Sequence, residues 1–94
     1  MSRLTDAEIE RALTRLPGWS REGDAIVKWF DWPSVPEAVA FTMKVAFAAE
    51  AADHHPEITI SYRRVRLAYT THSERGLTGK DVDGALAVEA ALVP

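Results

Sequence analysis

Two short runs of alternating apolar residues constrain the fold of this 94-residue chain more than any other feature. The first run covers residues 58–62 and the second covers residues 65–69, and in both every second side chain is apolar. A period of two is typical of strands that bury one face. Only two arginines separate the runs, so we predict an antiparallel hairpin.

The register of this hairpin can be predicted from the same pattern. If the two arginines form the turn, Tyr62 pairs with Val65 and the apolar side chains of both runs fall on one face. A slip by one residue would expose half of them. Extended to the base of the hairpin, this register sets His72 opposite His55, where paired Cβ atoms are about 5 Å apart.

The first third of the chain reads as a helix followed by another hairpin. Residues 5–8, Thr-Asp-Ala-Glu, form a capping box, and apolar residues then recur at helical spacing, which predicts a helix over about 6–15. A Pro-Gly pair ends it. Residues 19–21 and 25–30 read as strands, joined through the Glu-Gly-Asp loop at 22–24.

A long alanine-rich helix is expected in the middle of the chain. Ser34 to Glu37 repeat the capping box, with proline tolerated in the first turn, and open a helix of about seventeen residues. We interpret the large apolar side chains of this helix, Phe41, Met43 and Phe47, as ordinary core.

The chain closes with a third helix. Thr78 to Asp81 form another capping box, and the helix is expected over residues 81–93, apolar enough for self-association or a partner. The predicted order is therefore α-β-β-α-β-β-α. We expect an α+β fold, a four-stranded antiparallel sheet with three helices packed on one face, in one domain spanning residues 1–94.

Composition limits the classes of function. The formal net charge of −3 offers no general field for nucleic acid, so no nucleic-acid partner is expected. The chain has no cysteine, which excludes thiolate catalysis. No long apolar run indicates a leader or a membrane span, and we expect a cytoplasmic protein. So small a domain supports only a marginal core, which favours a homodimer or homotetramer.

All three histidines lie between residues 50 and 81, in Asp53-His54-His55-Pro56 and Thr70-Thr71-His72. Histidine titrates near pH ~6.5 and is the natural proton carrier at physiological pH, so we interpret the segment as a proton-transfer site. Glu50 lies one helical turn before His54 and is expected to accept a hydrogen bond from it.

Each of these residues also has a plainer interpretation. A His-His pair at a helix end is often a surface cap, and Asp81 can be a cap of the last helix alone. Three imidazoles and a carboxylate could also bind a metal. We expect no metal site, because His54 and His55 are adjacent and point in different directions, whereas helical ligand pairs are usually four residues apart.

Three blocks of sequence, taken together, resemble a known family. They are Glu50-x-x-x-His54-His55-Pro56-Glu57, then Tyr62-x-x-Val65-x-Leu67, then Thr71-His72-x-x-x-Gly76-Leu77-Thr78-x-x-Asp81. At this spacing they are similar to the signature of the pterin-4a-carbinolamine dehydratases, also called 4a-hydroxytetrahydrobiopterin dehydratases. The resemblance extends upstream to Leu16-Pro17-Gly18-Trp19 and covers nearly the whole chain.

The resemblance implies dehydration of 4a-hydroxytetrahydrobiopterin to quinonoid dihydropterin, as part of tetrahydrobiopterin recycling, with no cofactor. It implies that His54 and His72 are the acid–base pair and that His55 mainly holds the pterin. The other residues that it places against the substrate are Asp53, Thr70, Thr71 and Ser73, with Asp81 at the rim.

The resemblance also leaves a second class of function open. Some members of the family serve as dimerisation cofactors of a transcription factor, so a non-catalytic binding module of the same fold is the alternative. A third possibility is a pterin-binding protein acting in another pathway. Retention of all three histidines favours catalysis, since a scaffold does not need imidazoles.

Overall fold

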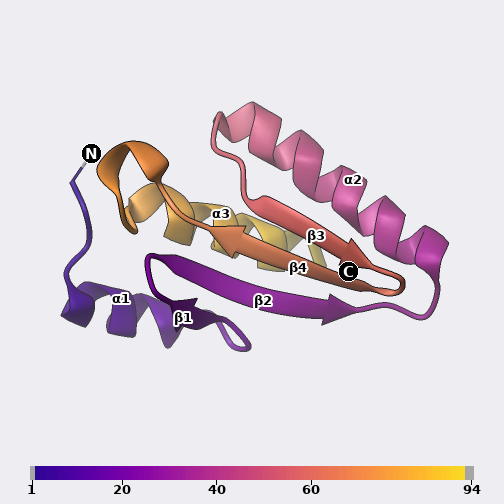
Figure 1. Ribbon diagram of the computed structural model, residues 1–94, viewed down its shortest axis with the longest axis horizontal. Coiled ribbons are helices and arrows are strands. Elements are labelled where there is room, and N and C mark those ends of the chain that lie inside the picture. The colour runs from indigo at the N-terminus through magenta and orange to yellow at the C-terminus, as the bar shows by residue number, and fades with distance from the viewer. Residues whose placement is uncertain (1, 93–94) are drawn as a thin grey trace.

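The computed structural model describes residues 2–92 and has the expected order of helices and strands (Figure 1). The elements are α1 (Asp6–Leu13), β1 (Ser20–Glu22), β2 (Ala25–Asp31), α2 (Val35–Ala52), β3 (Glu57–Ser61), β4 (Arg64–Tyr69), the short 3₁₀ turn η1 (His72–Glu74) and α3 (Gly79–Leu92). The α+β prediction is confirmed.

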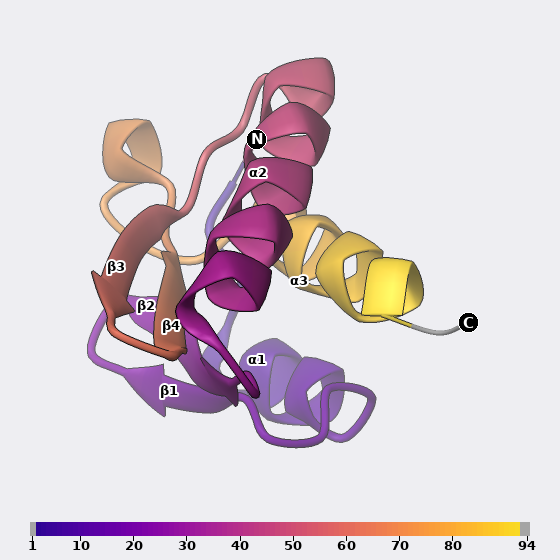
Figure 2. The same ribbon diagram turned by 90° about the vertical axis from the view of Figure 1, so that its right-hand side faces the viewer.

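The four strands form one antiparallel sheet in the order β1-β2-β4-β3. The three helices lie on the same side of this sheet, as the turned view shows (Figure 2). The central strands β2 and β4 supply the floor of the core, including Ile26, Val65 and Leu67, each at most 1% exposed. The sheet therefore buries one face under the helices, which is what strand alternation predicted.

The predicted register of the β3–β4 hairpin is wrong by two residues. Ser61 pairs with Arg64, and Tyr62 lies in the turn with a positive φ of 53°. The backbone N–H of Trp32 donates to the carbonyl of Arg63 and ties the turn to the end of β2. A shift of two residues keeps each side chain on its original face, so the apolar pattern does not distinguish the two registers. The last pair at the base of the hairpin is Glu57 with Ala68, so the predicted pairing of His72 with His55 is not formed.

Helix α2 buries fewer of its large apolar side chains than we expected. Phe41 lies in the core, but Met43 and Phe47 are 52% and 70% exposed, so their assignment to the core is wrong. Val35 and Val39 are also exposed, and residues at this spacing of four share one face of a helix. Val35, Val39, Met43 and Phe47 are called the α2 stripe below.

The helix caps follow the sequence closely. Thr5 and Glu8 form the reciprocal capping box of α1, and Ser34 accepts a hydrogen bond from the backbone of Glu37 at the start of α2. Helix α1 ends at Leu13, two residues earlier than predicted. These caps fix where the helices begin, and the end of α2 decides where His54 points.

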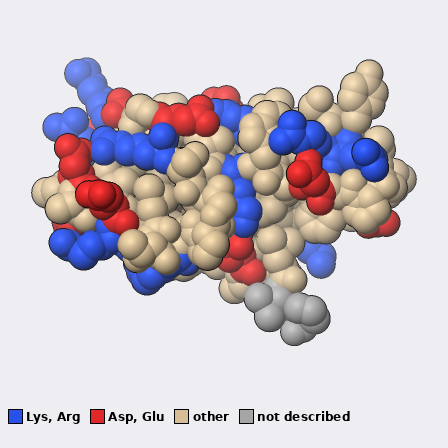
Figure 3. Space-filling view, turned by 90° about the horizontal axis from the view of Figure 1, so that it is seen from below, with Lys and Arg blue, Asp and Glu red and all other residues tan. Residues whose placement is uncertain are grey.

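The surface shown in Figure 3 carries acidic and basic side chains interspersed, with apolar and neutral groups between them. Mixed charge of this kind produces no single-sign field on that face. Within residues 2–92, no helix combines the length and the apolar character required to traverse a bilayer.

Candidate active site

The segments that carry the histidines, residues 53–56 before β3 and 70–72 after β4, lie at the end of the sheet where β3 begins and β4 finishes (Figure 1). Asp53 ends α2 in the left-handed conformation, with φ 51° and ψ 39°. Its conformation turns the chain away from the helix axis, so His54 leaves α2 toward α3. His55 precedes Pro56, which favours an extended backbone there, and β3 starts directly afterwards.

The best-defined contact of the site joins His54 to Asp81. His54 Nε2 lies 2.6 Å from Asp81 Oδ1, and the two side chains are 14% and 0% exposed. A carboxylate only accepts hydrogen bonds, so the pairing indicates that Nε2 carries a proton. In the neutral imidazole, Nδ1 then has a free lone pair.

The second oxygen of Asp81 is held just as firmly. Asp81 Oδ2 accepts hydrogen bonds from the Thr71 hydroxyl at 2.8 Å and from the backbone N–H of Thr78 at 2.9 Å. The Thr78 hydroxyl lies 2.9 Å from Thr71 Oγ1. Asp81 therefore does two things at once: it caps α3, as its sequence position suggested, and it orients His54. It is buried beneath the site and not at the rim, which corrects that expectation.

Glu50 does not have the expected partner. Its Oε1 accepts a hydrogen bond from Nε2 of His55, while His54 is bonded to Asp81. The spacing rule fails here because it applies to two residues of one helix, and the left-handed Asp53 ends that helix before His54. The Glu50–His55 pair is largely exposed, so Glu50 is bonded to a surface histidine and not to the half-buried His54.

His72 is carried by a compact loop between β4 and α3. Thr71 and Gly76 form an isolated β-bridge, and Arg75 adopts a left-handed φ of 55° that closes the turn around His72. His72 is exposed, and Thr71, the residue before it, is hydrogen-bonded to Asp81. Hydrogen bonds thus connect His54 to Asp81 and Asp81 to Thr71, and the exposed His72 directly follows Thr71 in the chain.

The remaining predicted contact residues lie around the same end of the sheet. Asp53 and Ser73 are exposed, Thr71 is buried, and Thr70 is half-buried with its hydroxyl donating to the carbonyl of Asp24. The structure therefore gathers these residues at α2's end and β4's end, but it turns Thr71 inward to Asp81 instead of outward.

Tyr69 is a neighbour of His54 that the sequence did not reveal. Its ring is stacked on the imidazole at an interplanar angle of 21°, with the ring centroids 6.1 Å apart. Burial, together with the nearby charge of Asp81, raises the pKa of Tyr69 to about 12, so its hydroxyl is protonated at physiological pH. The sequence signal for this packing is Gly84, because a glycine in the interior of a helix often marks the close approach of another group, here the Tyr69 ring.

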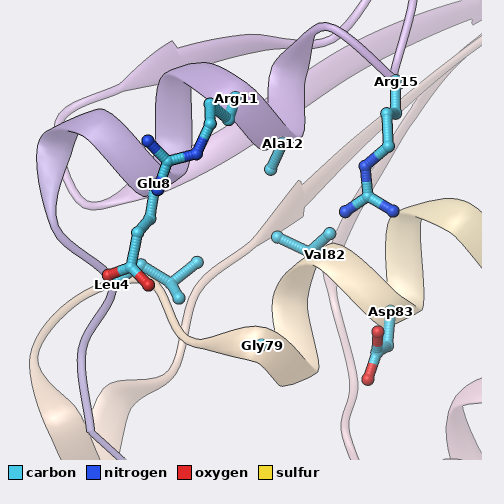
Figure 4. Close-up of a pocket in the computed structure, with 8 residues that line it drawn as sticks. All are labelled: Leu4, Glu8, Arg11, Ala12, Arg15, Gly79, Val82 and Asp83. Carbon is cyan, nitrogen blue, oxygen red and sulfur yellow. The ribbon is translucent and has the colours of Figure 1, made fainter.

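Two hollows frame this region. A small, mostly apolar cavity of about 160 Å³ lies between α2 and α3, and His54 and Tyr69 line one side of it. A larger hollow of about 420 Å³ lies between α1 and α3, where Arg11 and Arg15 are accompanied by Glu8 and Asp83 (Figure 4). No histidine lines the larger hollow, whereas His54 lines the smaller one.

In the part of the chain that the structure describes, no three side chains among His, Asp and Glu are grouped so that they could hold a metal ion. Asp81 is instead the centre of a hydrogen-bonded system that contains His54, Thr71 and Thr78, while His55 is bonded to Glu50 and His72 is exposed. An imidazole bonded to a buried carboxylate is an arrangement that acid–base sites use, and here it lies on an α+β scaffold.

Comparison with known proteins identifies the family that shares this scaffold. The family model described as "Pterin 4 alpha carbinolamine dehydratase" matches residues 2–91. A relative from Roseiflexus sp. (strain RS-1) is 53% identical over 88 residues, which is 94% of this chain and 95% of that protein. One from Chloroflexus aggregans is 50% identical and covers 98% and 99%. Both are provisionally named pterin-4-alpha-carbinolamine dehydratases. The chain belongs to this family.

Solved structures agree with the fold. A transcriptional coactivator/pterin dehydratase from Brucella melitensis superposes with a TM-score of 0.91 at 37% identity, covering 95% of this chain and 97% of that one. A pterin dehydratase-like protein described as a RuBisCO assembly factor of the alpha-carboxysome has a TM-score of 0.63 at 20% identity, covering 77% and 83%. The second likeness concerns the fold alone.

Proposed function

We propose that this protein dehydrates 4a-hydroxytetrahydrobiopterin to quinonoid dihydropterin and water in the cytoplasm, as a step of tetrahydrobiopterin recycling, without a metal or organic cofactor. The observation that carries the proposal is the His54 imidazole held by the buried Asp81 carboxylate. Family membership supports a pterin dehydratase, and the site supplies the proton-transfer groups that this reaction requires.

The reaction needs one base and one acid. The C4a–O bond breaks readily only when the hydroxyl leaves as water, so that oxygen must gain a proton while a ring nitrogen gives one up. In the proposal, Nδ1 of His54 takes the proton from the ring nitrogen, and Asp81 stabilises the imidazolium that forms. His72, which is exposed at the end of β4, donates a proton to the leaving hydroxyl.

The other residues hold the pterin. His55 is exposed beside Glu50, so its imidazole can contact a ligand that lies over the end of α2. In the proposal the exposed Asp53 and Ser73 and the half-buried Thr70 contact the pterin, whereas Thr71 and Asp81 act from beneath by supporting His54. This division separates residues that touch the ring from residues that orient the proton carriers.

The test is a direct assay. Purified protein is supplied with 4a-hydroxypterin generated by an aromatic amino acid hydroxylase, and the quinonoid product is followed by its absorbance. We expect the protein to accelerate product formation well above the spontaneous rate and in proportion to its concentration. A rate equal to that of a heat-inactivated sample would remove the enzymatic proposal.

A second observation, the α2 stripe, favours an additional binding role. Its four large apolar side chains are each 44% or more exposed, and contiguous apolar surface of this kind usually marks an interface. Helix α3, which we expected to provide this surface, buries Val82, Ala85 and Val88 in the core. We propose that the protein forms a homodimer or homotetramer through the α2 stripe. The same surface could serve a non-catalytic module that recruits a partner.

Charge placed on the α2 stripe should dissociate the assembly. In the double variant Met43→Glu and Phe47→Glu, four or more carboxylates would be buried in the interface, so we expect the mass measured by light scattering to fall to that of a monomer. Ala7→Glu, at an exposed position of α1 and away from α2, is the control and should keep the wild-type mass. A monomeric wild type, or a double variant of unchanged mass, would contradict the proposal.

A further inference from the structure

Gly84 lies in the interior of α3, where glycine is less favourable than alanine. The structure shows what its missing side chain makes possible. A Cβ atom at this position would lie 2.5 Å from Cε1 and 2.8 Å from Cζ of Tyr69, much closer than real atoms approach. The Tyr69 ring therefore packs closely against Gly84, in space that a larger side chain would occupy.

The Tyr69 ring is fixed on more than one side. It is 2% exposed, and the Trp19 ring lies beside it, with centroids 6.1 Å apart and planes at 43°. Its other neighbour is His54, whose imidazole is nearly parallel to it. A ring held by α3 and by Trp19 can shift little, so it presents His54 with a rigid apolar surface.

His54 needs such a surface. Its hydrogen bond to Asp81 fixes the position of Nε2, but the angle of a single hydrogen bond is soft, so small changes of the His54 χ1 and χ2 angles can still tilt the imidazole plane. A tilt changes the direction of Nδ1, which is the atom with the free lone pair. The Tyr69 ring is nearly parallel to the imidazole, with the centroids 6.1 Å apart, and borders it on one side, so it limits how far the imidazole can tilt in that direction.

We propose that Tyr69, packed against Gly84, is a positioning residue that sets the plane of the His54 imidazole and so directs Nδ1 toward the substrate. The proposal rests on the dehydratase function for its catalytic consequence. Its structural content, the orientation of the imidazole, can be measured in the protein without substrate. The aromatic ring provides the effect, and the hydroxyl is not needed for it.

Four variants separate this role from a purely structural one. Tyr69→Phe keeps the ring and should retain kcat within about twofold, whereas Tyr69→Leu should lower kcat by about tenfold with KM nearly unchanged. Gly84→Ala pushes on the ring and should also lower kcat. In the Tyr69→Leu background the same Gly84→Ala change should cause no further loss, because the atoms that it meets are gone.

The second measurement is the NMR spectrum of the His54 imidazole nitrogens in the ligand-free protein. We expect Tyr69→Leu and Gly84→Ala to shift or broaden these resonances and Tyr69→Phe to leave them in place. Unchanged resonances together with wild-type kcat in Tyr69→Leu or Gly84→Ala would overturn the proposal, even if the variant melted at a lower temperature. If the wild-type protein lacked dehydratase activity but Tyr69→Leu and Gly84→Ala still changed the His54 resonances, the proposed reaction would be wrong and the positioning role of Tyr69 would remain.

Discussion

Replacement of His54 by alanine is expected to lower kcat of the dehydration by about 10²–10⁴-fold, the usual contribution of one general acid–base group. The reason is that His54 is the imidazole bonded to a buried carboxylate, and its free nitrogen is the base in the proposed mechanism. The measurement is the initial rate of quinonoid product formation, corrected for the spontaneous reaction. His72→Ala should reduce kcat by a comparable factor, because it removes the proton donor.

Two matched variants sharpen this result. His54→Gln retains an N–H that can donate to Asp81 but cannot carry the proton, so it should be folded and nearly inactive. His55→Ala changes an exposed residue bonded only to Glu50 and should raise KM more than it lowers kcat. If His54→Gln worked at the wild-type rate, His54 would not be the base.

Replacement of Asp81 by asparagine is expected to abolish most activity while leaving the fold largely intact. The amide oxygen can take the place of Oδ2 and accept from Thr78 and Thr71, but the amide nitrogen then faces Nε2 of His54 and donates to it. His54 must adopt the other tautomer, with its proton on Nδ1. We expect kcat to fall by about 100-fold or more, measured by the same assay.

Asp81→Ala is the contrasting variant and should affect stability as well. It leaves the backbone N–H of Thr78 and the hydroxyl of Thr71 without their buried acceptor, which costs about 1–3 kcal/mol for each group. Denaturant unfolding followed by circular dichroism measures this loss. If Asp81→Asn lost as much stability as Asp81→Ala and kept full activity, the conclusion that Asp81 sets the tautomer of His54 would be wrong.

The fold could be predicted because local signals agreed with one another. The capping boxes, the Gly23 turn and the two alternating runs each indicated one kind of element, and their order left few arrangements. The register of the β3–β4 hairpin could not be predicted. Burial of one face excludes a shift by one residue but permits a shift by two, and the outcome depends on Tyr62, which takes a left-handed conformation that its residue type does not favour.

The contacts of the candidate site could be predicted only in part. The family resemblance placed the histidines and Asp81 in one site, but residue spacing assigned Glu50 to His54, because the helical rule was applied across a residue that ends the helix. The Tyr69 contact depends on the packing of β4 against α3, and packing between distant segments has no local signature except the glycine that permits it.

The shared use of Asp81 has a consequence for observation of the protein at work. One carboxylate accepts both the amide proton at the start of α3 and the proton of the imidazole. We therefore expect a ligand that displaces the His54 imidazole to change how often the first turn of α3 opens. The rate at which the Thr78 amide exchanges with heavy water would then report occupancy of the site without following the reaction.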